Sequence, residues 1–186
     1  MKKTILEVSN VTKKVTSPEG ELTIVNDISL SLEEGVFVSI LGPSGSGKTT
    51  LLAIMAGLDL PSRGSVKLLD KEITSLNEDK RAQIRSKDVG FVFQSFHLLP
   101  RLSALDNVMM PLEILGAKDA KERAVKALDE VGLSKRTGHV PHQLSGGEKQ
   151  RVAIARAMVK APSILFADEP TGNLDQSSTD NILELL

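Results

Sequence analysis

One segment, residues 42–49, constrains the fold of this chain more than any other. It reads Gly-Pro-Ser-Gly-Ser-Gly-Lys-Thr and fits the phosphate-binding pattern G-x-x-x-x-G-K-[ST]. The apolar run at residues 36–41 precedes it and predicts a strand that is buried on both faces of a parallel sheet. Residues 49–56 follow and predict a helix whose N-terminus faces a bound anion. The segment therefore predicts an α/β fold that holds the phosphates of a nucleotide.

Each residue type in this loop has a physical role. Gly42, Gly45 and Gly47 let the backbone wrap a phosphate with its N–H groups pointing inward. Lys48 can reach the β- and γ-phosphates, and the Thr49 hydroxyl can bind Mg²⁺. A glycine-rich turn without a ligand is the alternative, and the flanking strand and helix favour the phosphate site. The predicted phosphate-binding residues are Gly42, Pro43, Ser44, Gly45, Ser46, Gly47, Lys48, Thr49 and Thr50.

Two acidic residues, Asp168 and Glu169, end a second apolar run at residues 163–167. A carboxylate at the end of a buried strand can hold Mg²⁺ through water, and its neighbour can polarise an attacking water molecule. An isolated Asp-Glu pair is more often an ordinary surface charge. Its place after a buried strand and a phosphate loop favours a function.

Residues 145–147, Ser-Gly-Gly, are typical of a helix start. Ser145 is a favourable N-cap, and Glu148 follows at capping-box spacing. Two glycines there leave backbone N–H groups uncovered, which would make a second anion site. A flexible turn before an amphipathic helix explains the same residues equally well.

The rest of the chain predicts three regions without an internal repeat. Residues 1–35 alternate as antiparallel strands do, with a hairpin loop at residues 16–20. Further strands are expected at residues 65–69 and 89–93, and a solvated helix at residues 78–88. Residues 95–143 are expected to be helical. Within them, one helix is capped by Asp119, stopped by Gly132, and apolar at Ala124, Val125, Leu128 and Val131.

Taken together with Gln94 and residues 173–175, these motifs resemble the ATP-binding subunit of ABC transporters, in the usual order and over essentially the whole chain. Residues 57–59, 107–112 and 169–175 are similar to the branch of lipoprotein-release and macrolide-export ATPases. Residues 90–96 and Val15 are most similar to a proteobacterial member thought to work with a large permease and a periplasmic thioesterase/lysophospholipase.

The resemblance implies a P-loop NTPase (RecA-like) core with an N-terminal antiparallel β subdomain and an inserted helical subdomain. The whole chain, 1–186, would be one ATP-binding domain. Residues 1–94 and 144–186 would form the β subdomain and the nucleotide-binding core, and residues 95–143 the helical subdomain.

The resemblance also implies the roles of single residues. Lys48 and its loop would bind ATP, Thr49 and Gln94 would bind Mg²⁺, and Asp168 would hold Mg²⁺ through water. Glu169 would be the general base, which makes Glu169, Lys48 and Gln94 the catalytic set. Contact with the γ-phosphate of ATP on a second copy, in a head-to-tail dimer, is implied for Ser145, Gly146, Gly147 and Glu148. Asp175 would communicate across that interface.

Two departures from the family pattern stand out. The family usually stacks adenine on an aromatic residue upstream of the loop, and Val15 occupies that place, so an aliphatic contact is expected instead. The family's switch histidine lies beyond Asp175, whereas His97, His139 and His142 all precede Asp168 and the sequence ends at Leu186. A truncated chain with an incomplete central sheet is therefore expected, which leaves its own turnover open.

Composition agrees with the expectation of a soluble subunit, which would need a partner to hold it at a membrane. The net charge of -1 gives no bulk attraction for nucleic acid or anionic lipid, and there is no cysteine. No run approaches the ~20 apolar residues of a spanning helix. The expected location is cytoplasmic, peripheral on the inner face of the cell membrane, where an integral-membrane permease would hold the chain. In the family, a groove after Gln94 receives a helix of that permease.

Five residues are candidates for lining this groove, and filling the helical core is the equally weighted alternative for them: Phe96, Leu98, Leu99, Met109 and Met110. The expected function is an ATPase subunit that powers export or extraction of lipidated or hydrophobic substrates. A soluble ABC-type ATPase of DNA repair is a second reading, but the chain lacks heptad runs and cysteines. A nucleotide-binding module without turnover is the third.

Overall fold

The computed structural model describes residues 3–18, 20–172 and 179, and these residues form two compact units, residues 1–85 and 86–186. Asp175, with the rest of residues 173–175, lies outside the described residues. No described helix combines the length and the apolar character needed to cross a membrane.

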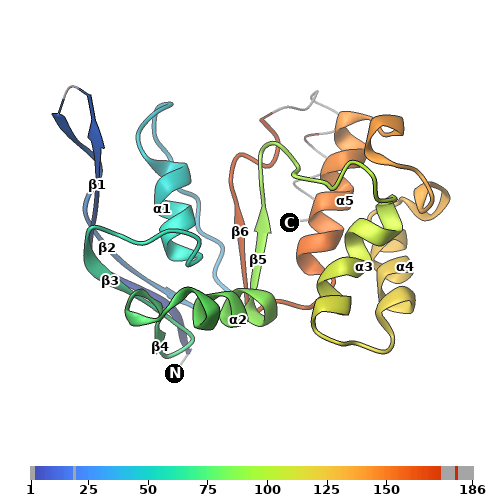
Figure 1. Cartoon of the computed structure of the whole chain (residues 1–186), viewed down its shortest axis with the longest axis horizontal. Coiled ribbons are helices and arrows are strands. Elements are labelled where there is room, and N and C mark those ends of the chain that lie inside the picture. Colours follow the sequence, from blue (N-terminus) through green and yellow to red (C-terminus); the bar gives the residue numbers. More distant parts are fainter. Residues whose placement is uncertain (1–2, 19, 173–178, 180–186) are drawn as a thin grey trace. The chain divides into compact units, whose positions relative to one another are not determined.

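The first unit contains a four-stranded antiparallel sheet in the order β2-β1-β3-β4 (Figure 1). Its strands are β1 (Thr4–Ser17), β2 (Gly20–Glu33), β3 (Arg63–Leu68) and β4 (Lys71–Glu72). The predicted antiparallel strands at the N-terminus and the strand near residue 65 are confirmed. The hairpin loop is shorter than predicted, because Thr16 and Ser17 still pair with Glu21 and Gly20.

Buried side chains face each other across this sheet. Leu6 pairs with Leu68 and Val8 with Val66, and all four are at most 2% exposed. The helix α1 (Lys48–Met55) packs against β2 and β3 and buries Leu51, Ile54 and Met55. A short 3₁₀ helix (Ile73–Ser75) follows β4, and α2 (Glu78–Asp88) then runs from the first unit into the second. The core of this unit therefore fixes where the loop before α1 begins and ends.

The strand predicted at residues 36–41 is wrong. These residues lie in no strand, and the side chains of Phe37 and Leu41 are 81% and 88% exposed. A strand exists only where a neighbour completes its hydrogen-bond ladder. The described parallel sheet consists of two strands, β5 and β6, and its ladder includes none of these residues. The apolar character of residues 36–41 was therefore not sufficient to predict a strand, because no described strand pairs with these residues.

The second unit is built around the parallel strands β5 (Val89–Val92) and β6 (Ile164–Ala167), which are paired in register from Val89↔Ile164 to Val92↔Ala167. Both strands were predicted, one residue longer each. The helix α5 (Gly146–Met158) lies beside them (Figure 1). Ile154 packs on Val92, and a Cβ on Gly90 would lie 2.9 Å from the carbonyl of Ala157. The helix therefore runs antiparallel to the strands, with its N-terminal end toward their carboxyl ends.

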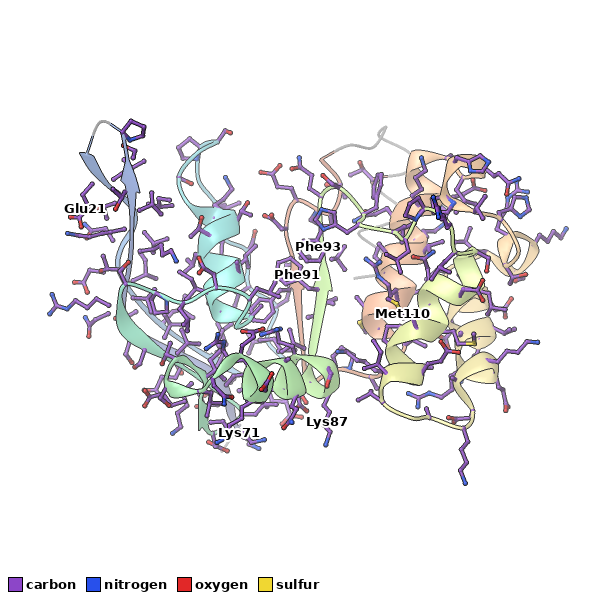
Figure 2. All side chains as sticks on the ribbon, viewed as in Figure 1. Glu21, Lys71, Lys87, Phe91, Phe93 and Met110 are labelled. Atoms are coloured by element: carbon purple, nitrogen blue, oxygen red, sulfur yellow. The ribbon has the colours of Figure 1, made fainter. Side chains whose placement is uncertain are left out.

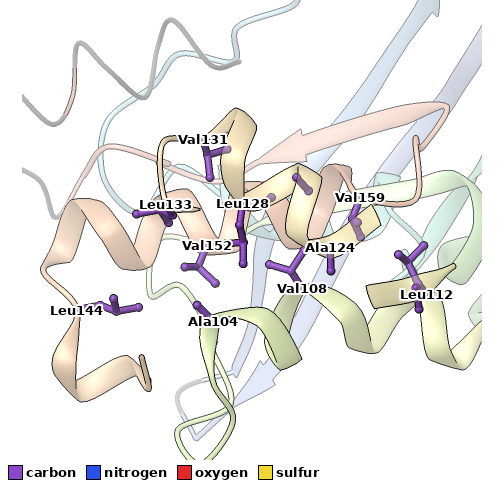
Figure 3. Packing of buried hydrophobic residues seen from close by; sticks show 13 residues of the cluster. Ala104, Val108, Leu112, Ala124, Leu128, Val131, Leu133, Leu144, Val152 and Val159 are labelled. Carbon is purple, nitrogen blue, oxygen red and sulfur yellow. The ribbon is translucent and has the colours of Figure 1, made fainter. Parts of the chain in front are cut away.

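Two more helices, α3 (Ala104–Ile114) and α4 (Ala120–Glu130), pack with α5 around one apolar cluster (Figure 3). Short 3₁₀ helices, Ser134–Arg136 and Pro141–Gln143, connect α4 to α5. Helices are present within the predicted helical region, from Ala104 to Gln143, and their core also includes Val152, Ala155 and Val159 of α5.

The details of α4 agree in part with the prediction. Ala124, Leu128 and Val131 are buried, whereas Val125 is 43% exposed and does not belong to the core. Position 125 follows position 124 by only one residue, so the two side chains diverge by roughly 100° around the helix. Asp119 precedes the helix without a side-chain cap hydrogen bond. Gly132 ends it in the left-handed conformation (φ 71°), as expected for a stop.

Candidate functional site

The glycines of the loop before α1 adopt conformations that other residues disfavour. Gly45 and Gly47 have φ values of 81° and 85°. A Cβ on Gly47 would lie 2.4 Å from the carbonyl oxygen of Ile24, and one on Gly42 would lie 2.7 Å from Oγ of Ser46. The close approach of the loop to the backbone of β2 therefore requires glycine at position 47, and the left-handed φ favours glycine at position 45.

The side chain of Lys48 folds back onto the start of this loop. Its Nζ donates hydrogen bonds to the carbonyl oxygens of Gly42 and Pro43, both at 3.0 Å. The described hydrogen bonds of this lysine go to carbonyl oxygens of its own loop, so its N–H groups can exchange these acceptors for the oxygens of a bound anion. The N-terminus of α1 adds its partial positive charge at the same place, since Gly47 is the N-cap of that helix. Lys48 and the N-terminus of α1 therefore place positive charge at the end of the loop, which favours an anion there.

Two further residues of the first unit were predicted to take part in nucleotide binding. Thr49 is exposed in the first turn of α1. Val15 lies half-buried on β1, opposite Leu22 near the tip of the hairpin. Leu22 is 56% exposed, so the hairpin presents an aliphatic surface there.

In the second unit, the strand ends bring the predicted acidic pair and Gln94 together. The N–H of Asp168 donates to the carbonyl of Val92 at 2.9 Å, which extends the β5–β6 ladder to its carboxyl end. Asp168 is 8% exposed, whereas Glu169 is exposed and has a left-handed φ of 44°. Nε2 of Gln94 donates to Oε2 of Glu169 at 3.0 Å. The structure thus brings Gln94 into contact with Glu169, 75 residues away along the chain.

Gly172 completes this cluster, and it was quoted only as part of a longer motif. A Cβ at this position would lie 2.9 Å from Nε2 of Gln94 and 3.4 Å from Oε2 of Glu169. Its N–H donates to the carbonyl of Glu169 at 3.0 Å, closing the turn. The signal in the sequence was a glycine three residues after a predicted functional acid, but nothing there showed what it would contact.

Ser145 begins α5 with the predicted capping box. Its Oγ accepts from the N–H of Glu148 at 3.2 Å, and Oε2 of Glu148 accepts from the N–H of Ser145 at 2.8 Å. Arg136 donates from Nε to the other carboxylate oxygen of Glu148 at 2.8 Å. The hydrogen bond from the Ser145 backbone, followed by that from Arg136, holds the pKa of Glu148 below its usual range.

This arrangement separates the roles of the four residues predicted at the start of α5. Both carboxylate oxygens of Glu148 are engaged in holding the helix end. The N–H groups of Gly146 and Gly147 belong to the first turn, where the helix itself supplies no acceptors. The hydroxyl of Ser145 accepts from the N–H of Glu148 and also interacts with the Glu148 carboxylate. The helix end therefore offers donors to an anion, and Glu148 supports them.

For two residues of α5 the sequence analysis predicted no individual role. Gln150 is fully buried, and neither its Nε2 nor its Oε1 has a hydrogen-bond partner among the described residues. Arg156 donates from Nη1 to the carbonyl of His97 at 2.6 Å and from Nη2 to the carbonyl of Phe96 at 2.8 Å. The sequence showed Arg156 only as a polar residue within an amphipathic helix, because its partners are backbone carbonyls. It showed Gln150 only as part of a motif on which the family resemblance rests.

A shallow pocket of about 290 Å³ lies between β5, α3 and α5. Phe91 of β5 and Phe93, which follows the strand, line it with stacked rings whose centroids are 4.2 Å apart, and Met110 lines it from α3 (Figure 2). His97 and Lys160 add polar groups. The five groove candidates divide between the two readings. Leu98 and Met109 pack against the helical core, whereas Met110 lines the pocket and Leu99 is 41% exposed. Phe96 is half-buried and belongs to neither set.

Comparisons with known proteins agree with this set of features. The chain is 48% identical, over its whole length and 83% of the relative, to the "Lipoprotein-releasing system ATP-binding protein LolD" of Acinetobacter baylyi. It is 46% identical over 98% of its length to the "Macrolide export ATP-binding/permease protein MacB" of Chlorobaculum tepidum, of which it spans 28%.

A solved structure is also similar to the fold of this chain. It is described as the "Dimeric structure of a post-hydrolysis state of the ATP-binding cassette MJ0796 bound to ADP and Pi". The TM-score is 0.91 at 40% sequence identity, over 97% of this chain and 81% of the other. The α/β cassette fold is thereby confirmed. Residues 25–172 match the ABC transporter family, and the chain belongs to that family.

Proposed function

We propose that this chain is the ATP-hydrolysing subunit of a membrane exporter or extractor of lipidated or hydrophobic substrates. The observation that supports the proposal most is the Gln94–Glu169 hydrogen bond at the carboxyl ends of β5 and β6. Because Gln94 occupies Oε2 of Glu169, the carboxylate is held in one orientation and its other oxygen can accept a proton from an attacking water molecule. LolD and MacB, whose names state export or release functions, favour this class of substrate.

ATP would bind through its phosphates in the loop of residues 42–50. Lys48, which contacts two loop carbonyls, would exchange these partners for phosphate oxygens. Mg²⁺ would be held by Thr49, Gln94 and, through water, Asp168. This donor set consists of oxygen atoms alone, which suits that hard cation. When bound, Mg²⁺ would neutralise charge on the transferred phosphoryl group. Val15 would contact the adenine through its methyl groups.

A second copy of the chain would complete the site. Ser145, Gly146 and Gly147 of one copy would donate hydrogen bonds to the γ-phosphate bound by the other, and Glu148 would hold that helix end in place. The solved relative in a post-hydrolysis state is dimeric, which favours this arrangement. The communicating role of Asp175 and a periplasmic partner stay predictions.

A permease would hold the chain at the inner face of the cell membrane. The pocket lined by Phe91, Phe93 and Met110 is the docking surface that we propose for it. Met and aromatic side chains suit such a surface, because they adapt to an apolar partner.

The experiment that tests this proposal is Glu169→Gln in the full chain. We expect turnover to fall by roughly 10²–10⁴-fold, as for loss of a general base, while ATP binding persists because the phosphate loop is unchanged. Turnover by a coupled phosphate assay and binding by calorimetry measure the two. Equal turnover in variant and parent would remove Glu169 from its role. Binding without turnover in the parent itself would favour the nucleotide-binding module.

A further inference from the structure

The turn after Gln94 is held by an arginine of α5. Arg156 contacts two consecutive carbonyls, those of Phe96 and His97, with separate Nη atoms. A planar guanidinium suits this task, because it directs several N–H donors in fixed directions. A single side chain thus bonds the helix that begins at Ser145 to the segment that carries Gln94.

The residues at this turn have an unfavourable backbone conformation. Phe96 and His97 both have positive φ values, 60° and 47°, although neither is glycine. Such residues persist only where surrounding contacts hold them. The N–H of Phe96 donates to the carbonyl of Phe93, and the rings of Phe93 and His97 are 4.6 Å apart. Beyond these local contacts, Arg156 supplies the two hydrogen bonds that reach the turn from another element.

The charge of Arg156 is not balanced by a carboxylate. Among the ion pairs of the described residues, none includes Arg156. Burial lowers its pKa, which is the effect of removing the guanidinium from water without a nearby negative charge. An arginine that only stabilised packing could be replaced by an apolar side chain at lower cost. Its hydrogen bonds to the turn are its evident interactions.

We propose that Arg156 is a positioning residue for the hydrolysis reaction, because it fixes the turn that places Gln94 against Glu169. This inference rests on the proposed roles of Gln94 and Glu169. Gln94 lies two residues before Phe96, so rotation of the strained turn moves its amide away from Oε2 of Glu169. The two hydrogen bonds of Arg156 would also transmit a movement of α5 to Gln94, because Arg156 lies on the helix that starts at Ser145.

The test compares Arg156→Ala and Arg156→Lys in the full chain. We expect kcat to fall about 10-fold or more in the alanine variant, because small displacements of a catalytic group have large effects on rate. The dissociation constant of ATP, measured by calorimetry, should stay within about 3-fold, since that loop is unchanged. The lysine variant should recover part of kcat, because an ammonium still donates to a carbonyl but cannot hold both in the planar fork.

Arg123 provides the matched control. It also donates from a guanidinium to a backbone carbonyl, that of Val159 just after α5, but it does not contact the turn. Arg123→Ala should lower the melting temperature and leave kcat near the parent value. Parent-like kcat in folded Arg156→Ala overturns the proposal, as does an equal loss of kcat in Arg123→Ala. If Arg156→Ala does not fold, an unchanged kcat in folded Arg156→Lys overturns it instead.

Failure of the proposed function has a different signature. If Glu169→Gln abolishes turnover but the Arg156 variants retain it, the positioning role alone is wrong. If Glu169→Gln leaves turnover intact, the proposed general base is wrong, and Arg156 loses the reaction it was inferred to support.

Discussion

Two glycines of the phosphate loop share a backbone conformation but differ in surroundings. Gly45 and Gly47 are both left-handed, yet a Cβ on Gly45 has nothing within 4 Å, whereas one on Gly47 meets the carbonyl of Ile24. We expect Gly45→Ala to lower the free energy of unfolding by about 1–2 kcal/mol through conformation alone. Gly47→Ala should cost a further ~1–3 kcal/mol through steric overlap. Urea unfolding measures both, and equal losses would contradict the role of Ile24.

Single residues were predictable where a fixed spacing carries the chemistry. Lys48, Asp168 and Glu169 were predicted from motifs and Gln94 from the family resemblance, and Gln94 and Glu169 are in contact at the ends of β5 and β6. Arg156 was not found, because its partners are carbonyl oxygens at a turn, and any residue has such a carbonyl. The importance of this contact comes from the positive φ values of Phe96 and His97. The sequence does not predict these values, because such conformations are uncommon for residues other than glycine.

Among helices and strands, local signals were better predictors than apolar runs. The start of α5 at Ser145 follows from side chains that hydrogen-bond within a few residues, and the stop after α4 follows from the left-handed conformation that Gly132 adopts. Residues 36–41 failed because a strand depends on distant partners, which periodicity cannot supply. Phe37 and Leu41 in this segment are exposed. An apolar run therefore indicates a tendency to be buried, but it does not identify the strand that would pair with it.

The cap of α5 gives a pH-dependent prediction for Glu148→Gln. Because the folded state lowers the pKa of Glu148, the ionised form is stabilising, and this stabilisation is present above the usual glutamate pKa. It is lost as the pH falls through the lowered value. We therefore expect the variant to be less stable than the parent by on the order of 1 kcal/mol at pH 7. The difference should vanish in stronger acid.

Glutamine keeps the shape of the cap, so the comparison isolates charge. The two free energies of unfolding, followed by urea titration from neutral to acidic pH, should converge as the carboxylate becomes protonated. A difference that stays constant across this range would show that the hydrogen bonds to Ser145 and Arg136 do not depend on the ionised form.

At the level of the whole protein, the proposed motor must pass movement to a permease through a surface that does not also hold the fold together. The pocket beside Met110 meets this requirement, because Leu98 and Met109 belong to the helical core while Met110 faces the pocket. A charge at Met110 would be placed in a docking surface rather than in the core. Its effect on binding and its effect on folding can therefore be separated.

We expect Met110→Lys to abolish co-purification of the permease from membranes, with little change in melting temperature, because a buried charge in an apolar interface is unpaired. Met158→Lys is the matched control, since Met158 is 44% exposed on α5 and does not line the pocket. Leu98→Ser should lower the melting temperature through the lost core contact yet retain docking. Retained docking by Met110→Lys, or an equal loss with Met158→Lys, would place the permease on another face of the molecule.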